Sequence, residues 1–267
     1  FVDNAVFIRQ KASVYQANGA KSLGVVSLEN DPADFNWTTE LGTGSEDSSM
    51  SFGKRELAPH PLAKLIKVSN TLLRVAVMSA DQLVQQRLGY KVAVTQEAGF
   101  MTGTGVQQPL GLFTASALGI STGRDVSTDN TTSSITADGL INAKYAVKGQ
   151  YQDSGEWIFH RDGIKQIRKL KDGNGQYIWA AGLGGQPNTI LDRPVNQTEY
   201  APNTFTTGLY VGLFGDLRFY WIADNLSLQI QRLVELYAAT NQTGFIGRIE
   251  TDGLPVLEEA FARVKLA

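Results

Sequence analysis

The residue types that most often carry out chemistry are scarce in this sequence. Its 267 residues include two histidines, His60 and His160, and no cysteine. A chain without cysteine holds no disulfide, no thiolate nucleophile and no iron–sulfur site of its own. His60 lies between two prolines and His160 ends a predicted strand, and both settings favour a structural role over a catalytic one. Any histidine-based catalytic or metal site would have to use one of these two side chains.

Three carboxylates close together in the sequence, Asp153, Glu156 and Asp162, form a loose acidic group. Paired carboxylates can act as general acid and base. The spacing and the polar neighbours are more typical of separate solvated charges. We therefore expect no acid–base centre at this place.

Glycines near the middle of the chain suggest a nucleotide loop at first sight. Gly103-Thr-Gly105 could open a dinucleotide fingerprint, but the third glycine is missing and the segment follows a helix, not a strand. Neither a P-loop nor a Gly-x-Ser-x-Gly elbow occurs. With no convincing catalytic, cofactor or metal motif, the sequence predicts a protein that is not an enzyme and needs no cofactor.

Composition sets further limits. The hydrophobic fraction of 42% is enough for a sizeable core, and the length suits two domains or one domain with a large insertion. Lysine and arginine total 24 against 26 acidic residues, so the basic excess that grips nucleic-acid phosphates is missing. No apolar run is long enough for a transmembrane helix. The first residue is Phe1, which leaves trimming, processing of a leader or an unrecorded segment open.

The first part of the chain predicts strands and a projecting hairpin. Strand-like pieces at 12–15 and 22–28 flank Asn18-Gly19, which favours a hairpin turn. The stretch 29–53 is acidic, and no lysine or arginine occurs between Lys21 and Lys54. Turn-forming residues at its centre predict a long two-stranded hairpin with a polar tip. The aromatic residues near this tip could pack on a neighbouring subunit or on their own domain.

The central part predicts a long helix and an abrupt stop. Residues 56–68 alternate as a strand does, and Ser79 with Gln82 fits a helix capping box. Apolar residues recur at helical spacing at Leu73, Val77, Ala80, Val84 and Leu88. A helix over 79–100 would be about 33 Å long. Gly103 and Gly105 end it, and Pro109 prevents it from resuming.

The remainder alternates between helical and strand-like patterns. We expect a loop at 122–136, helix at 137–152, a strand at 155–160, a short helix at 163–171, a tight turn at Asp172-Gly-Asn-Gly and a strand at 191–196. The last third reads as strands at 209–213, 218–223, 226–234, 244–249 and 260–266, with helix possible around 225–238. The pattern is that of a mixed α+β protein, not a doubly wound sheet.

The order of these pieces resembles the major capsid proteins of tailed bacteriophages and prophages. The resemblance runs from about Phe1 to Leu266 and is most specific at Glu97–Phe113. The matching pieces are Trp37 to Glu40 in the acidic hairpin, Gly103, Gly105, Pro109 and Gly111 at the helix end, Trp157-Ile-Phe, Leu170-Lys-Asp172 to Gly175, Leu191-Asp-Arg-Pro-Val, and Phe214-Gly215-Asp216.

This resemblance implies an α+β tailed-phage capsid fold and a division of the chain. Residues 1–28 would be an N-terminal arm, 29–57 an extended hairpin over a neighbouring subunit, 58–105 a peripheral domain with the spine helix, 106–222 an axial domain, and 223–267 a return to the peripheral domain. Phe35 and Trp37 would anchor the hairpin. The other assembly candidates are Glu40, Gly103, Gly105, Pro109, Gly111, Asp172, Gly175, Gly215 and Asp216.

The resemblance also implies which partners the chain has and where in the cell and the virion it is found. The chain would assemble with itself into pentamers and hexamers of an icosahedral virion shell, formed in the bacterial host cytoplasm, that encloses DNA without reading its sequence. Scaffold, portal and maturation protease would be further partners, and no membrane is involved. Some members crosslink a lysine of the extended hairpin to a neighbour's asparagine. The absence of lysine from Ser22 to Gly53 predicts no such crosslink here.

Two alternatives remain open from the sequence. Encapsulin compartments share this fold and enclose enzyme cargo instead of a genome. An unrelated α+β hydrolase or binding protein would instead show a pocket with convergent polar groups.

Overall fold

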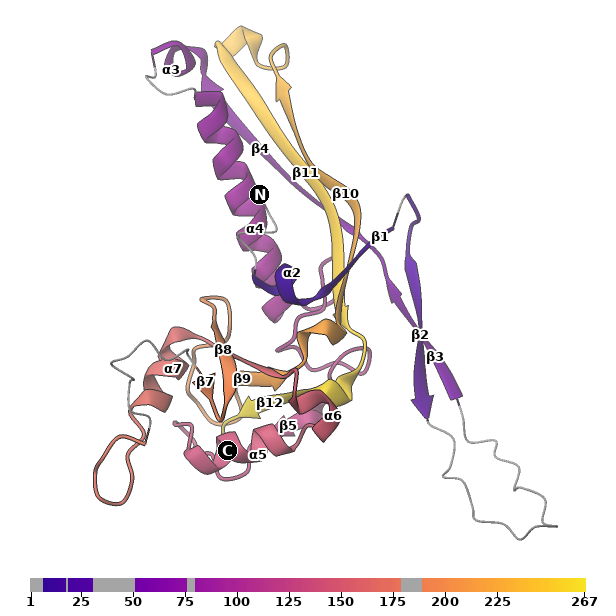
Figure 1. Cartoon of the computed structure of the whole chain (residues 1–267). Coiled ribbons are helices and arrows are strands. Elements are labelled where there is room, and N and C mark those ends of the chain that lie inside the picture. The colour runs from indigo at the N-terminus through magenta and orange to yellow at the C-terminus, as the bar shows by residue number, and fades with distance from the viewer. Residues whose placement is uncertain (1–6, 18, 31–50, 76–79, 179–188) are drawn as a thin grey trace, which may run out of the picture.

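The computed structural model describes residues 7–17, 19–30, 51–75, 80–178 and 189–267 of the chain. They form a long sheet backed by one helix, a compact body below it and a ribbon that projects to one side (Figure 1). The first part contains α2 (Phe7–Lys11), β1 (Ser13–Gln16), β2 (Leu23–Asn30), β3 (Ser51–Leu57), β4 (His60–Ser69), α3 (Asn70–Val75) and α4 (Ala80–Thr102).

The middle and last parts supply the compact body and two long strands. They contain η1 (Thr122–Arg124), β5 (Asp125–Val126), α5 (Ala137–Tyr145), α6 (Gly149–Gln152), β6 (Glu156–Phe159), α7 (Arg161–Arg168), β7 (Thr189–Ile190), β8 (Arg193–Gln197), β9 (Tyr210–Gly215), η2 (Leu217–Phe219), β10 (Tyr220–Leu233), η3 (Ala238–Thr240), β11 (Gln242–Pro255), η4 (Glu258–Ala260) and β12 (Phe261–Lys265).

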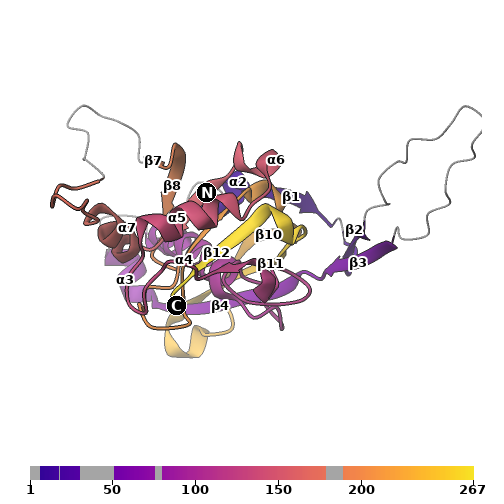
Figure 2. The same ribbon diagram turned by 90° about the horizontal axis from the view of Figure 1, so that it is seen from below.

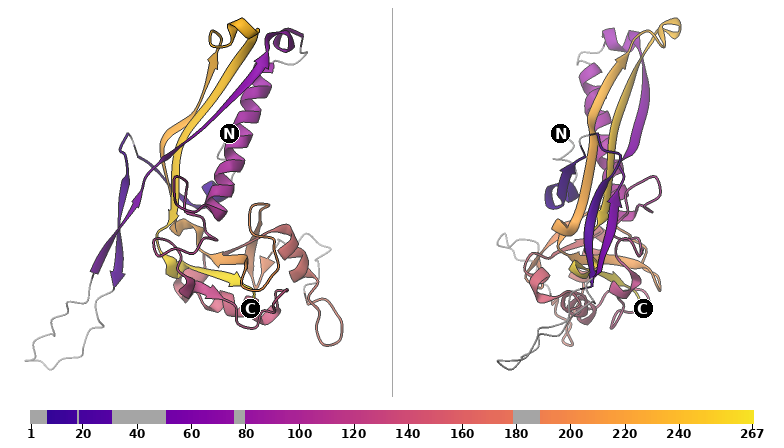
Figure 3. Two further views of the ribbon diagram at one scale, coloured as in Figure 1. Left: turned by 180° about the vertical axis from the view of Figure 1, so that it is seen from behind. Right: turned by 90° about the vertical axis from the view of Figure 1, so that its right-hand side faces the viewer.

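The first unit, which we call the spine body, is the four-stranded sheet β1-β10-β11-β4 with α4 along one face (Figure 3). β10 and β11 are 14 residues each, and at about 3.3 Å per residue they extend over roughly 45 Å. A β-carbon at Gly247 of β11 would contact Leu88 of α4, which fixes the face of the sheet that the helix covers. Alternate residues of β11 from Phe245 to Gly253 are accordingly buried under α4.

The second unit, the compact body, is a six-stranded sheet of order β5-β12-β9-β6-β8-β7 with α5, α6 and α7 around it (Figure 2). Trp157, Phe159 and Phe214 pack together in its core, with the Trp157 and Phe214 ring centroids 4.6 Å apart. Trp157 Nε1 donates a hydrogen bond to the carbonyl of Ile190 at 3.0 Å, so the indole is both buried and satisfied.

One hydrophobic cluster joins the two bodies. It includes Phe100 and Met101 at the end of α4, Leu112 of the following segment, and Ile158 and Leu213 of the compact sheet. A shared core of this kind makes the joint part of the folded structure and not a flexible linker.

The ribbon consists of β2 and β3, paired antiparallel from Leu23 with Leu57 to Asn30 with Ser51. This pairing confirms that the acidic stretch lies between two paired strands. The tip expected at 41–49 lies outside the described residues. Figure 1 shows the ribbon leading away from both bodies.

Two expectations for the N-terminal half, one on strand pairing and one on the extent of a helix, need correction. The strands near 12–15 and 22–28 exist, but β1 pairs in parallel with β10 and β2 pairs with β3, so the two do not form a hairpin. Ala20 N–H donates to the carbonyl of Ala17, and Gly19 has φ +83°, so the turn itself forms. Leu73 belongs to the separate helix α3, and Val77 and Ser79 of the expected helical stripe and cap lie outside the described residues.

Corrections in the second half follow from tertiary pairing. Residues 137–152 form two helices, since α5 ends at Tyr145 and α6 begins at Gly149. Leu191 and Asp192 are a two-residue turn with positive φ, because β7 pairs back on β8. The possible helix at 225–238 is instead strand as far as Leu233, held in register by β11.

The end of the chain also differs from the expected return to the spine-helix unit over 223–267. β12 pairs with β9 and β5 inside the compact sheet, whereas β10 and β11 lie in the spine body. The apolar residues of β12 explain this position, since Phe261, Ala262 and Val264 are all buried in the compact body or at its border with the spine body.

Candidate assembly site

The assembly candidates within the described residues fall at three separate places. Phe35, Trp37 and Glu40 lie outside the described residues. Gly103, Gly105, Pro109 and Gly111 lie where α4 meets the compact body. Gly215 ends β9 and Asp216 follows it before η2, whereas Asp172 and Gly175 lie in a surface turn. The structure therefore brings together the four residues of the helix end but not the whole set.

The helix end is a tightly hydrogen-bonded junction of backbone groups. After α4 the chain loops out and returns antiparallel, so that the N–H groups of Gly111, Leu112 and Phe113 donate to the carbonyls of Gly103, Phe100 and Met101, each at 2.9 Å. The last carbonyls of a helix have no partner within the helix. Here the returning segment supplies those partners and fixes the direction of the chain into the compact body.

Gly103 and Gly111 are glycines because two backbones approach each other at this point. A β-carbon on Gly103 would lie 2.1 Å from the carbonyl oxygen of Pro109, and one on Gly111 would lie 2.5 Å from that of Met101. Both distances are far below van der Waals contact. The close approach allows the junction hydrogen bonds described above to form.

The loop between these glycines is exposed. Gly105 has φ +79° and Gln107 has φ +54°, so the loop contains two left-handed residues. Val106 is 74% exposed, and Gln108 Nε2 donates to Thr104 Oγ1 at 2.7 Å. A single exposed apolar side chain is common on protein surfaces and by itself marks no contact site.

Gly215 and Asp216 have a structural role within the chain. A β-carbon on Gly215 would lie 2.6 Å from the carbonyl oxygen of Ala260. The buried carboxylate of Asp216 accepts from the backbone N–H of Arg218 and from its guanidinium at 2.6 Å. That side-chain oxygen caps η2 and sets the course of the chain from β9 into β10.

The Asp172 turn lies on the surface of the compact body. Asp172 Oδ1 accepts hydrogen bonds from the N–H groups of Asn174 and Gln176, at 2.9 and 2.8 Å, and Gly175 has φ +81°. This is the tight turn that the sequence predicts. Every residue of it is exposed.

The base of the ribbon is held firmly against the junction. Arg55 donates to the carbonyls of Leu118 and Pro255, both at 2.8 Å, and Leu57 is fully buried. Asp252 accepts from Ala58 N–H at 2.8 Å. Burial raises the pKa of Asp252, although its backbone hydrogen bonds partly offset that effect.

A buried carboxyl group also lies between the two bodies. Glu97 of α4 accepts a hydrogen bond from Thr198, which follows β8, at 2.7 Å. Burial raises the pKa of Glu97, and the hydrogen bond from Thr198 acts in the opposite direction. Sequence reasoning did not single out Glu97 for this role, because nothing local indicates that a residue a hundred positions away will cover it.

Two buried ion pairs were likewise not predicted. Arg9 of α2 pairs with Asp224 of β10, and Arg263 of β12 pairs with Asp125 at 2.7 Å. The Arg263 guanidinium also lies 4.6 Å from the ring centroid of Tyr210. Pairs with both charges buried depend on good geometry, and loss of one partner leaves an uncompensated charge.

The residues first considered for chemistry have ordinary structural partners. His160 Nδ1 accepts the N–H of Asp162 and caps α7, while its Nε2 lies 3.3 Å from Glu199. Asp153 pairs with Arg193 and Glu156 with Lys11, so the acidic group is dispersed. Within the described ranges no cluster of three or more metal-type side chains occurs, and no described helix is both long and apolar enough to cross a membrane.

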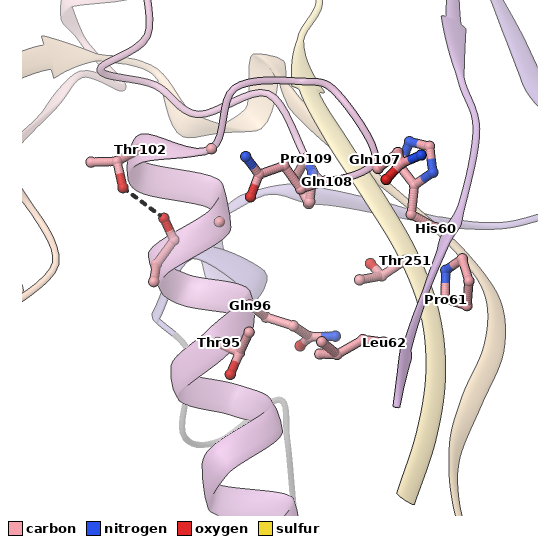
Figure 4. A pocket seen from close by; sticks show the side chains of 13 residues that line it. His60, Pro61, Leu62, Thr95, Gln96, Thr102, Gln107, Gln108, Pro109 and Thr251 are labelled. Carbon is pink, nitrogen blue, oxygen red and sulfur yellow. Dashed lines mark hydrogen bonds between the residues drawn. The ribbon is translucent and has the colours of Figure 1, made fainter. Parts of the chain in front are cut away.

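A pocket of about 370 Å³ lies beside the junction, between the end of α4, the loop after it and strands β4 and β11 (Figure 4). His60, Gln96, Thr251 and Gln108 are among its lining residues. Its lining residues include three threonines and one histidine but no carboxylate.

Comparison with known proteins gives consistent matches. A family model described as the phage capsid family matches residues 2–266. The major capsid protein of Halomonas phage phiHAP-1 is 26% identical over 203 residues, which cover 69% of this chain and 34% of that protein. The chain therefore spans about a third of the length of this curated relative.

Solved structures share the fold. The capsid of the native GTA particle matches with a TM-score of 0.85 and 24% identity, over 97% of this chain and 89% of the other. A chain of Microbacterium phage Oxtober96 matches with a TM-score of 0.74 and 12% identity, over 98% and 91%. One of Mycobacterium phage Bobi matches with 0.70 and 14%, over 98% and 90%. This tailed-phage capsid fold confirms the predicted fold class and rules out an unrelated α+β hydrolase fold.

Proposed function

We propose that this chain, which belongs to the phage capsid family, is the structural subunit of a phage shell. Many copies would tile a closed icosahedral container around double-stranded DNA. The observation that carries this proposal is the family match over residues 2–266, which covers nearly the whole chain.

The three parts of the molecule suit a tile in such a shell. The spine body would form the peripheral domain, and the compact body would form the axial domain at five-fold and six-fold centres. The ribbon would reach over a neighbouring copy, since it projects from both bodies (Figure 1). An isolated two-stranded ribbon is marginally stable in water, so a neighbour under it would contribute to its stability.

Contacts between copies would be numerous and individually modest. Phe35 and Trp37 are the proposed anchors of the ribbon tip, because aromatic side chains dominate the energetics of interfaces. The rigid junction at Gly103 and Gly111 would hold the two bodies at a fixed angle. The Asp172 turn would present exposed backbone at the outer end of the compact body.

The proposed partners are further copies in pentamers and hexamers, together with scaffold, portal and maturation protease. The site of action is the virion, after assembly in the host cytoplasm. With formal net charge -2 the shell would enclose DNA without gripping it. The chain would act without enzymatic activity and without a cofactor.

Covalent crosslinking through residues 22–53 is not expected. No lysine occurs from Ser22 to Gly53, so this stretch lacks the amine of an isopeptide bond. Assembled particles should dissociate into single chains on a denaturing gel. A ladder of covalently joined chains would contradict this point while leaving the shell function intact.

Electron microscopy of the purified full chain tests the function. Closed particles of uniform size are expected, and persistent monomers under all assembly conditions would count against the proposal. Deletion of 42–49 should leave a folded subunit that forms no shells. Replacing 42–49 by a glycine–serine segment of equal length is the control for the length of the hairpin. Normal particles from the deletion would show that the tip is dispensable.

A further inference from the structure

The pocket beside the junction contains polar atoms that the chain itself leaves unsatisfied. Gln96 is 2% exposed, and neither its Oε1 nor its Nε2 has a hydrogen-bond partner among the described residues. Thr251 of β11 is 4% exposed, and its Oγ1 also lacks a partner there. Buried polar groups are nearly always paired, so three such atoms at one place need an explanation.

The two side chains converge on the same space. Figure 4 shows Gln96 extending from α4 toward Leu62 and Thr251, under the loop that carries Gln107 and Gln108. The Gln96 amide offers two donors and one acceptor, and the Thr251 hydroxyl offers one of each. Because glutamine has three rotatable side-chain bonds, a small rotation points its amide into the open part of the pocket.

The lining restricts what the pocket can accept. It contains no aspartate, glutamate, lysine or arginine, and His60 is its one titratable side chain. A phosphate or a metal ion would find no compensating charge. Pro61, Leu62 and Pro109 add apolar wall beside the amide and hydroxyl groups. The complementary ligand is therefore a neutral group that both donates and accepts, such as a side-chain amide or a peptide unit.

We propose that this pocket receives an amide-bearing segment from a second copy of the chain, which pairs with Gln96 and Thr251. This inference rests on the proposed shell function, since that function places other copies against every subunit. The volume of the pocket, about 370 Å³, suits a short stretch of polypeptide. The neighbouring loop presents exposed Val106, which would pack on the incoming chain.

Replacing Gln96 by leucine separates this role from a purely structural one. Q96L keeps the approximate size and removes the unsatisfied amide, so the unassembled subunit should melt several degrees higher. The same change removes hydrogen bonds to the neighbour. The threshold concentration for assembly should therefore rise about 2- to 12-fold for each bond lost. The matched control is Q86L at an exposed position of the same helix, which should move neither measurement.

The directions in which Q96L moves the melting temperature and the assembly threshold decide whether the pocket is an intersubunit site. A more stable subunit with weaker assembly supports the pocket as an intersubunit site. Loss of both stability and assembly would mean that Gln96 only supports its own subunit, and an unchanged threshold would mean that the pocket holds water alone. Either result would overturn the proposal.

A photoreactive amino acid in place of exposed Gln108, on the rim, identifies the occupant. Illumination of assembled particles should give a two-chain product, and illumination below the assembly threshold should give none. Assembled particles that yield no two-chain product, or a product with a different protein, would refute the second copy as occupant. If the unmodified chain never forms particles, the shell function fails as well, and that outcome is distinct from normal particles without the crosslink.

Discussion

Gly103→Ala should be one of the most damaging single-methyl additions in the chain. The new β-carbon would lie 2.1 Å from the carbonyl oxygen of Pro109 and 2.4 Å from that of Gly99. Carbon and oxygen atoms need about 1 Å more than this. Both obstructing atoms are backbone, so no side chain can rotate away to make room.

The loss in the free energy of unfolding follows from the contacts that Gly103→Ala would disturb. Overpacking of a closely packed site costs about 1–3 kcal/mol. Retreat of the loop would also weaken the bond from Gly111 N–H to Gly103 O at 2.9 Å, worth about 1 kcal/mol. Reduced freedom of the unfolded chain returns about 0.4–1 kcal/mol. The net loss in the free energy of unfolding is about 1–3.5 kcal/mol, or roughly 2–14 °C in melting temperature for a chain of this size.

Thermal melting of the unassembled subunit, followed by circular dichroism, measures this loss. Gly149→Ala is the matched control, because a β-carbon there has nothing within 4 Å. Gly149 is the first residue of α6, so alanine should be neutral or stabilise by up to about 1 kcal/mol. A Gly103→Ala protein that melts within about 1 °C of the parent would refute the view that backbone contact dictates glycine at the junction.

Three further substitutions test other parts of the account. Arg9→Ala leaves the Asp224 carboxylate buried without its cation. Urea unfolding should therefore show the free energy of unfolding lowered by about 3–5 kcal/mol. Replacing both residues by apolar ones is the control, and it should lower the free energy of unfolding by less. The pKa of Glu97 in the folded state lies above the ordinary value of 4.5. The protonated Glu97 side chain therefore contributes its full share of the stability below pH 4.5, and this share is lost as pH rises through the raised pKa. Glu97→Gln should therefore unfold at higher urea than the parent at pH 8, and the difference should shrink toward pH 4. Asp172→Ala removes two hydrogen bonds of the exposed turn, and amide exchange should accelerate at 173–177 with little change in the melting temperature of the whole chain.

Local signals in the sequence were sufficient for much of the fold. Gly103, Gly105 and Pro109 mark the end of α4 because helix termination depends on residues next to it in the chain. The Asp172 turn and β6 were predicted for the same reason. Resemblance to a known family supplied the overall architecture, which periodicity alone does not determine.

The errors arose where distant pairing overrides local preference. Helix was an alternative around 225–238, but pairing with β11 makes residues up to Leu233 a strand, with register shifts near Leu226. Asn18-Gly19 favours a hairpin, yet β1 finds its partner more than 200 residues later in β10. Glu97, Gln96 and Thr251 became interesting only once the structure showed what covers them. A sequence alone does not show which buried side-chain atoms lack a hydrogen-bond partner.

The strand order of the two sheets has a consequence for the timing of folding. β1 and β4 are made early but pair with β10 and β11, and β9 is made before its neighbour β12. The four-stranded sheet cannot be completed until the ribosome has synthesised the chain as far as Pro255, and the six-stranded sheet must wait for Lys265. Non-local strand pairing of this kind slows folding. We therefore expect incomplete chains on the ribosome to lack the finished sheets that the proposed contacts between copies would need.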